Sequence, residues 1–307
     1  MKGPLSPMAV RSGLENKMPP GQTTAGAEAE GLPKSKPFYL AAPVKIWGGI
    51  LAFAVMLAIF APVVTTHDPV TFNTAFRLKP ISPEFWLGTD SFGRDVFSRL
   101  IYGARISLSV GVGTVVISAV LGIVFGVIAG YFRWADMIIM RLMDGLMAIP
   151  GILLAIALVA ISGATLTTVL VAIAVPEIPR VVRMVRSVII GVRNEPYVEA
   201  AMCVGTSVPF MVWRHMLPNT LAPLLVQSTY IFASAIMTEA VLSFLGAGIP
   251  PETPSWGNMM ADGRLYFLLK PELVLIPGVM VSLTVLSVNI LGDVFRDNLD
   301  PRMAKRL

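Results

Sequence analysis

Six long apolar runs limit this chain to folds that span a lipid bilayer. They cover residues 47–64, 106–130 and 137–161, a run that begins at 166, and residues 221–245 and 273–292. A helix needs about 20 apolar residues to cross the hydrocarbon core, and its backbone polar groups must all be paired there. Strands of a membrane barrel would instead alternate between apolar and polar residues. The runs therefore predict an all-α integral membrane protein with six transmembrane helices.

The spacing of these runs divides the chain into segments. Residues 46–65 are the predicted first span and residues 66–105 a connector. Residues 106–295 form a core of five spans, which a more polar loop at 191–220 interrupts, and residues 296–307 are a tail. Residues 1–45 hold no long apolar run, so burial cannot offset the entropy of ordering them. We expect this first segment to be mostly disordered, and we do not interpret it as a signal peptide.

Composition agrees with a membrane protein. Hydrophobic residues make up 55% of the chain and charged residues only 14%, against about 25% charged in an average soluble protein. The net charge of +5 is small, and the basic residues lie mostly beside apolar runs, where they set orientation in a membrane. Nucleic acid is therefore not an expected partner. The single cysteine, Cys203, cannot form an internal disulfide.

The basic residues also predict the orientation. With the N-terminus placed in the cytoplasm, 17 of the 24 Lys and Arg residues fall on the cytoplasmic side and 7 on the other side. Cytoplasmic loops carry an excess of Lys and Arg. Both termini are therefore predicted to be cytoplasmic, and so is the loop at 191–220.

That loop contains EPYVEAAMCVGTSVPFMVWRHMLPN (195–219), a pattern typical of two short helices joined at a glycine. Asn194 can cap the first helix, with Pro196 in its first turn. Gly205 suits a left-handed helix end, and Pro218 is expected to end the second helix. The unit is either a docking surface or a hairpin that lies on lipid. Apolar stripes are expected at Tyr197, Ala200, Ala201 and Val204, and at Phe210, Trp213 and Leu217.

Small residues recur every four positions in the second run, at Gly122, Gly126 and Gly130. Such stripes let membrane helices approach closely, although glycine is also common in membrane helices in general. We expect these three glycines to pack against another helix.

Three acidic residues fall within or beside the predicted spans: Asp144, Glu177 and Glu239. An unpaired charge in hydrocarbon is costly, so such acids are candidates for function. They could relay protons in a secondary transporter, or they could pair with cations and hold helices together. Arg141 and Arg180 each lie three residues from an acid, which allows local pairs with Asp144 and Glu177.

Five stretches in the expected order resemble the permeases of ABC importers. Glu199-Ala200-Ala201, Gly205 and Leu217-Pro218 are similar to the EAA loop of that family. His215 departs from the family pattern, which usually has an aliphatic residue there. The residues of the other four stretches resemble those of the dipeptide, oligopeptide and nickel branch of the family. The resemblance covers about residues 80–303. The four stretches are LGTDSFGRDVFSRLIYGARISL (87–108), MRLMDGLMAIPGILLAIAL (140–158), EAVLSFLGAGIPPETPSWGNMM (239–260) and NILGDVFRDNLDPR (289–302).

The resemblance implies a type I ABC importer permease fold in a bacterial cytoplasmic (inner) membrane, with the EAA loop as a cytoplasmic coupling helix. It implies a homologous second permease chain, two ATPase subunits or domains and an extracytoplasmic substrate-binding protein as partners. The chain has no G-x-x-x-x-G-K-[ST] phosphate loop, so ATP and Mg²⁺ are expected on the ATPases and no cofactor or metal on this chain. The expected coupling residues are Glu199, Ala200, Ala201, Gly205, His215, Leu217 and Pro218.

Two segments on the other side of the membrane also carry candidate residues. We interpret Asp90, Arg94 and Asp95 as a polar, solvated connector that caps the second span; a gate or a contact with the binding protein is the alternative. Trp256 could anchor its loop at the membrane interface. Prolines are expected to kink the helical runs at positions 150, 176, 179 and 277.

The sequence thus predicts a non-catalytic permease half that imports di- or oligopeptides and draws on ATP hydrolysis through residues 195–219. The same architecture importing nickel or another small chelate is the alternative. A proton-coupled transporter would need ordered acids along a path, and a membrane scaffold would not need a docking helix. The residues that bind substrate are not predicted by any motif.

Overall fold

The computed structural model describes residues 42–299, and every named element within that range is a helix. The only β-type pairing in that range is an isolated bridge between Thr89 and Asp95. The all-α prediction is therefore confirmed for the described chain. The expectations for residues 1–41 and 300–307 lie outside the described residues.

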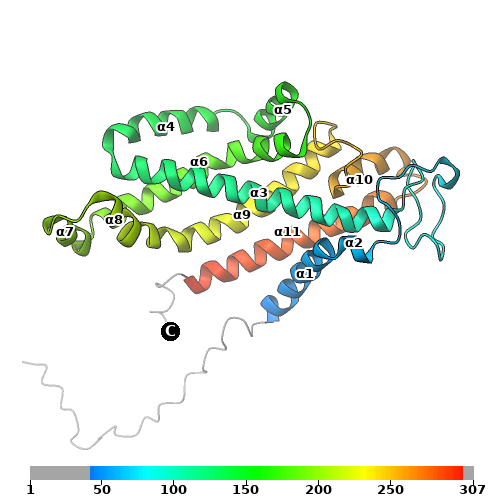
Figure 1. Cartoon of the computed structure of the whole chain (residues 1–307), viewed down its shortest axis with the longest axis horizontal. Coiled ribbons are helices and arrows are strands. Elements are labelled where there is room, and N and C mark those ends of the chain that lie inside the picture. The colour runs from blue at the N-terminus through cyan, green and yellow to red at the C-terminus, as the bar shows by residue number, and fades with distance from the viewer. Residues whose placement is uncertain (1–41, 300–307) are drawn as a thin grey trace, which may run out of the picture. The chain divides into compact units, whose positions relative to one another are not determined.

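Long helices run beside one another, and several of the shorter ones lie at the two ends (Figure 1). The long helices are α1 (Ala42–Ile59), α3 (Val96–Tyr131), α6 (Leu166–Arg193), α9 (Leu217–Phe244) and α11 (Glu272–Leu299). One end of the bundle carries α7 (Pro196–Cys203), α8 (Val208–Met211) and the π-helical turn η3 (Val212–Met216). The remaining elements are α2 (Ala61–Val64), η2 (Thr74–Phe76), α4 (Arg133–Met147), α5 (Gly151–Ser162), α10 (Trp256–Gly263) and η4 (Arg264–Tyr266).

Three of the described helices are long and apolar enough to cross a membrane. They are α3, the continuous helix Val208–Phe244 that ends in α9, and α11. The bent pair of α4 and α5 would be a fourth if it counts as one span. The helix α1 is shorter, and α6 carries charged residues along its second half. Six spans therefore stay a prediction.

The third predicted span, 137–161, is not one helix. Its residues belong to α4 and α5, which are bent by 89° relative to each other. Pro150 lies directly before α5. Proline has no N–H to donate to the preceding turn, and its ring disfavours the helical conformation of the residue before it. The prolines at 176, 179 and 277, in contrast, lie inside helices.

The second predicted span begins ten residues too late, at 106 instead of Val96. Asp95 caps α3, because its carboxylate accepts a hydrogen bond of 3.0 Å from the Ser98 N–H. The first turns of α3 are polar, so apolar length alone did not reveal them. The helix that contains the second predicted span thus begins within the predicted connector, and the boundary at 105 stays a prediction.

Close contact between α3 and α6 organises the bundle. Gly122, Gly126 and Gly130 lie along one face of α3. They face, in the same order, Val181, Val185 and Ile189 on α6. A Cβ atom added at the three glycines would stand 2.4, 2.7 and 2.7 Å from the nearest atom of these partners. Such distances are too short for carbon atoms, so only glycine permits this approach.

We predict that Gly126→Val destabilises the protein by about 1–3 kcal/mol, because added carbons would collide with Val185 and with the Val182 carbonyl. Thermal unfolding of the detergent-purified protein measures the effect. Gly145→Ala is the matched control, since Gly145 lies inside α4 with no atom within 4 Å of an added Cβ. An unchanged melting temperature for Gly126→Val would contradict the close-packing role.

Candidate functional site

The hairpin of α7 and α8 forms directly after α6. Pro196 lies in the first turn of α7, as predicted, and Glu195 is the residue that precedes the helix. The prediction that Asn194 caps α7 is wrong. Asn194 instead ends α6, and its N–H donates to the Gly191 carbonyl at 3.2 Å. Asn194 therefore lies at a helix boundary, but it caps the end of α6 and not the start of α7.

Gly205 turns the chain between the two short helices. Its φ angle is +82°, the left-handed conformation that the sequence predicted. The Gly205 N–H donates to the Met202 carbonyl at 3.0 Å, and the Thr206 N–H donates to the Ala201 carbonyl at 3.1 Å. These two bonds form the Schellman motif that closes many helices.

The second helix of the hairpin does not end at Pro218, as the sequence suggested. It continues through η3 into α9, and the Leu217 N–H bonds to the Val212 carbonyl across a π-helical turn. Pro218 has no N–H, so it cannot donate a hydrogen bond to a carbonyl one turn earlier. A π-helical turn widens the helix at this point, so the chain enters α9 without a break.

Buried side chains fix the hairpin to the bundle. Val198 of α7 is fully buried, and it belongs to one apolar cluster with Met211 and Met216 of the hairpin and with α6 residues. The same α6 residues that contact the α3 glycines, among them Ile189, belong to this cluster. Arg193, the exposed last residue of α6, joins that helix to the end of α3 through a hydrogen bond of 2.9 Å to the Tyr131 carbonyl. The hairpin is therefore packed on the contact between α3 and α6.

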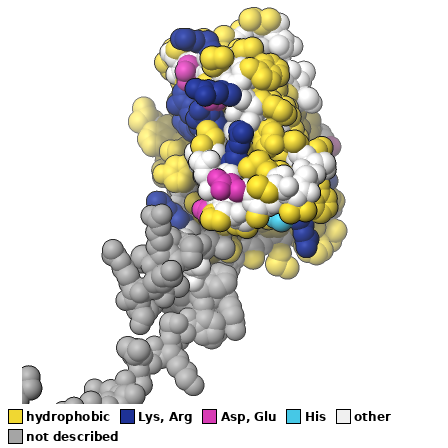
Figure 2. Space-filling model, turned by 90° about the vertical axis from the view of Figure 1, so that its left-hand side faces the viewer, with side chains coloured by type: hydrophobic (Ala, Val, Ile, Leu, Met, Phe, Trp, Pro, Cys, Tyr) yellow, Lys and Arg dark blue, Asp and Glu magenta, His cyan; other side chains and the backbone are white. Residues whose placement is uncertain are grey.

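The outward side of the hairpin exposes apolar side chains. Figure 2 faces this end of the molecule and shows apolar, basic and acidic side chains side by side. Val204 is 86% exposed, Trp213 72% and Phe210 56%. The stripe predicted for α7 thus faces outward, while Val198 makes the inward contact. Of the predicted coupling residues, Glu199, Ala200, Gly205 and Pro218 are exposed, and Ala201, His215 and Leu217 are half-buried.

His215, the departure from the family pattern, lies inside the hairpin. Its ring centroid is 6.1 Å from that of Tyr197 on α7. Asn219 joins the same group, because its side-chain amide donates to the His215 carbonyl at 2.6 Å and to the Tyr197 hydroxyl at 3.4 Å. His215 therefore packs α7 against the start of α9.

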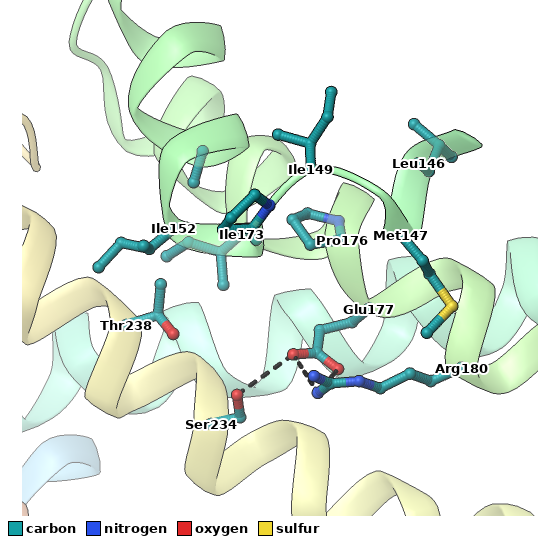
Figure 3. Close-up of a pocket in the computed structure, with 13 residues that line it drawn as sticks. Leu146, Met147, Ile149, Ile152, Ile173, Pro176, Glu177, Arg180, Ser234 and Thr238 are labelled. Atoms are coloured by element: carbon teal, nitrogen blue, oxygen red, sulfur yellow. Dashed lines mark hydrogen bonds and ion pairs between the residues drawn. The ribbon is translucent and has the colours of Figure 1, made fainter. Parts of the chain in front are cut away.

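A cavity of about 280 Å³ lies between the break of α4 and α5, the middle of α6, and α9 (Figure 3). Glu177 and Arg180 of α6 face it together with the hydroxyl-bearing side chains Ser234 and Thr238 of α9. The Arg180 guanidinium donates to both Glu177 oxygens, at 2.8 and 3.0 Å, and the Ser234 hydroxyl donates to one of them at 3.2 Å. Sequence reasoning found the charged pair but not the cavity.

The acids predicted to lie within or beside the spans pair in different ways. The local pair of Glu177 with Arg180 is confirmed, but Asp144 does not follow the same pattern. Its carboxylate lies 2.6 Å from an Arg183 nitrogen on α6, so the expected partner Arg141 is wrong. The bend between α4 and α5 places α4 along α6, and this arrangement, not sequence spacing, selects the partner. Asp136 and Arg186 form a second pair between the same helices, at 2.5 Å.

Glu239, the third acid, is fully buried and is held by three serine hydroxyls. Ser243 donates at 2.9 Å, Ser255 at 2.8 Å and Ser107 at 3.4 Å. These serines come from α9, from the residue before α10, and from α3. The carboxylate therefore joins three elements, which explains why a polar group occurs inside an apolar run.

The end of the bundle that carries α10 contains a buried ionic network. Arg94 contacts Asp90 and Asp262 at 2.6 Å each, and its side chain is only 1% exposed. Arg99 lies 3.8 and 3.7 Å from the same two acids. The expectation of a solvated connector is therefore wrong, because the connector folds back against α10. Trp256 is also fully buried, with its indole N–H bonded to the Leu100 carbonyl at 3.0 Å, and does not anchor at an interface.

We predict that Arg94→Met destabilises the protein by about 3–5 kcal/mol, because the buried Asp90 carboxylate and the half-buried Asp262 carboxylate lose their partner. The matched control is Arg77→Met, which removes an exposed arginine that bonds the Tyr266 hydroxyl at 2.7 Å. That change should cost at most about 1 kcal/mol. Thermal unfolding of both variants in detergent measures the difference, and equal losses would contradict the network's role.

Known proteins share the sequence of the part of the chain that carries this site. Residues 122–305 match the family of binding-protein-dependent transport system inner membrane components. The chain belongs to this family. The match covers α6, the hairpin of α7 and α8, the cavity and α9.

Curated relatives cover most of the chain. The probable peptide ABC transporter permease protein y4tQ of Sinorhizobium fredii is 53% identical over 263 residues, which cover 86% of this chain and 90% of that protein. The dipeptide transport system permease protein DppC of Alkalihalophilus pseudofirmus is 45% identical over 255 residues, which cover 83% and 84%. The sequence-based resemblance to peptide-type ABC permeases is therefore confirmed.

A solved structure of the MetNI methionine ABC transporter, in an inward-facing conformation, shares the fold. One of its chains aligns with a TM-score of 0.54 and 18% sequence identity, over 66% of this chain and 97% of that chain. At this identity the likeness concerns the fold alone. It supports the predicted type I ABC permease architecture.

Proposed function

We propose that this chain is one of two permease subunits of an importer that moves di- or oligopeptides across the inner membrane. A second, homologous permease chain completes the path, two cytoplasmic ATPases supply the energy, and an extracytoplasmic binding protein delivers the peptide. The chain itself hydrolyses no ATP. It crosses the membrane six times with both termini in the cytoplasm.

The shape of the hairpin carries this proposal. Its inward side is anchored through the buried Val198 to the apolar cluster that α6 and the end of α3 share, whereas its outward side exposes Phe210 and Trp213. A unit that is both firmly attached and apolar on its outside can transmit a push from a docked protein to the bundle. A hairpin lying on lipid would not need buried side chains that it shares with α6.

Peptides are the proposed substrate because both relatives described above, which are 53% and 45% identical to this chain, carry peptide or dipeptide in their names. Glu199, Ala200, Ala201 and Gly205 form the proposed contact with the ATPase, and His215, Leu217 and Pro218 hold that contact on α9. The glycine stripe of α3 then carries movement of the hairpin and α6 to the rest of the bundle.

We predict that Glu199→Arg lowers peptide uptake and peptide-stimulated ATP hydrolysis at least tenfold in the complex reconstituted in liposomes. Glu199 is exposed on α7, so reversing its charge should disturb docking without disturbing the fold. Glu252→Arg is the matched control, an exposed charge reversal near the α10 end, and it should leave coupling intact. Normal stimulation in Glu199→Arg would refute the coupling role. Uptake of a nickel chelate instead of peptides would favour the alternative substrate.

The single cysteine tests the orientation. Cys203 is exposed on α7, so a membrane-impermeant maleimide should label it in inverted membrane vesicles but not in right-side-out vesicles of cells that express this chain. Cys203→Ser should abolish the label in both. Labelling in right-side-out vesicles alone would place the hairpin outside the cell and refute the proposed topology.

A further inference from the structure

We propose that the cavity between α5, α6 and α9 is a binding subsite for the two charged termini of a short peptide, with Glu177 for the ammonium group and Arg180 for the carboxylate. This inference rests on the proposed function, since it names where in this chain the imported peptide is held. The cavity contains both signs of charge, two hydroxyl groups and apolar walls (Figure 3).

The depth of the site is the first support. Glu177 lies in the middle of α6, ~16 Å along the helix from Leu166 at a rise of about 1.5 Å per residue. Ser234 lies at a comparable distance from the end of α9. Charges at such depth are expensive to keep in a membrane, and transporters commonly bind substrates near the midplane. A charged pair that only joined helices would not need to face a cavity.

The pair itself has unused bonding capacity. Within the described chain, Arg180 donates only through Nη1, so Nη2 and Nε are available to a carboxylate. Its side chain is 53% exposed, while that of Glu177 is only 10% exposed. Arg180 can therefore swing toward a ligand while Glu177 stays anchored by Ser234. Guanidinium groups bind carboxylates through two parallel bonds, which suits this geometry.

The remaining lining fits the body of a small peptide. The Thr238 hydroxyl makes no hydrogen bond within residues 42–299, so it can serve a peptide group. Ile149, Ile152 and Ile173 offer apolar surface for side chains. A volume of about 280 Å³ lies near the lower limit of ligand pockets, which favours a short peptide over a long one.

Backbone features keep the site open. Pro176 and Pro179 lie inside α6 and remove two N–H donors beside Glu177. Gly151, the first residue of α5, lies so close to Pro176 that an added Cβ would be 3.1 Å from the proline ring. The 89° bend at Pro150 holds α5 over the cavity instead of letting α4 continue through it.

Equilibrium binding of radiolabelled alanyl-alanine to the assembled permease–ATPase complex, without the binding protein, tests this subsite. Glu177→Gln and Arg180→Gln should each raise the Kd about tenfold or more, the range expected for loss of a charge-assisted bond. N-acetyl-alanyl-alanine should compete poorly against the native complex but about as well as alanyl-alanine against Glu177→Gln. Alanyl-alanine amide, which lacks the carboxylate, should also compete poorly against the native complex. It should compete about as well as alanyl-alanine against Arg180→Gln. Asp136→Asn, which breaks an ion pair outside the cavity, is the control and should leave every Kd unchanged.

A second pair of variants covers the case in which loss of the ion pair prevents assembly. Ile152→Trp fills the cavity without changing charge, and Ile161→Trp places the same ring at an 84% exposed position on the same helix. Ile152→Trp should abolish alanyl-alanine binding, and Ile161→Trp should not. Normal binding in Ile152→Trp, or in both charge variants, overturns the subsite, as does absence of binding to the native complex.

Uptake by the native complex with its binding protein distinguishes failure of the subsite from failure of the proposed function. Peptide uptake that is insensitive to the cavity variants overturns the subsite and leaves the proposed function standing. Absence of ATP-driven peptide uptake by the native complex overturns the proposed function, and the subsite with it.

Discussion

The close approach of α3 and α6 is the contact on which the rest of the structure depends. Three glycines spaced four residues apart remove every side chain that would keep the helices apart, and three branched residues of α6 fill the space. Lipid offers little hydrophobic drive for helices to associate, so close van der Waals packing has to supply the attraction. Because α6 carries both the cavity pair and the connection to α7, its position against α3 fixes both sites.

Buried polar groups then determine how the ends of the bundle are joined. Glu239 gathers three serines from separate elements, and Arg94 gathers two aspartates at the α10 end. At the opposite end, the exposed Arg193 donates a hydrogen bond to the Tyr131 carbonyl at the end of α3. The buried Glu239 and Arg94 are costly to bury unless they are paired, so each strongly favours one arrangement of the helices over its alternatives.

Local sequence rules predicted the hairpin well. Pro196 and Gly205 have intrinsic backbone preferences that act without regard to the rest of the fold, and both lie where the sequence placed them. The same rules failed at Asn194, which ends α6 instead of capping α7. They also failed at Pro218, where the helix continues from η3 into α9. They failed again at Asp144, because the partner of a long-range ion pair depends on which helix lies alongside.

The sequence by itself determined that the chain is helical, which runs are apolar, and which motifs relate it to ABC permeases, since these follow from composition, period and residue order. Only the tertiary structure decided that α4 and α5 bend apart at Pro150, that Asp90, Arg94 and Asp95 are buried, and that Glu177 and Arg180 face a cavity with Ser234. The reason is that cavities and ion pairs between helices arise from distances between residues far apart in the chain. Local preferences carry no information about those distances.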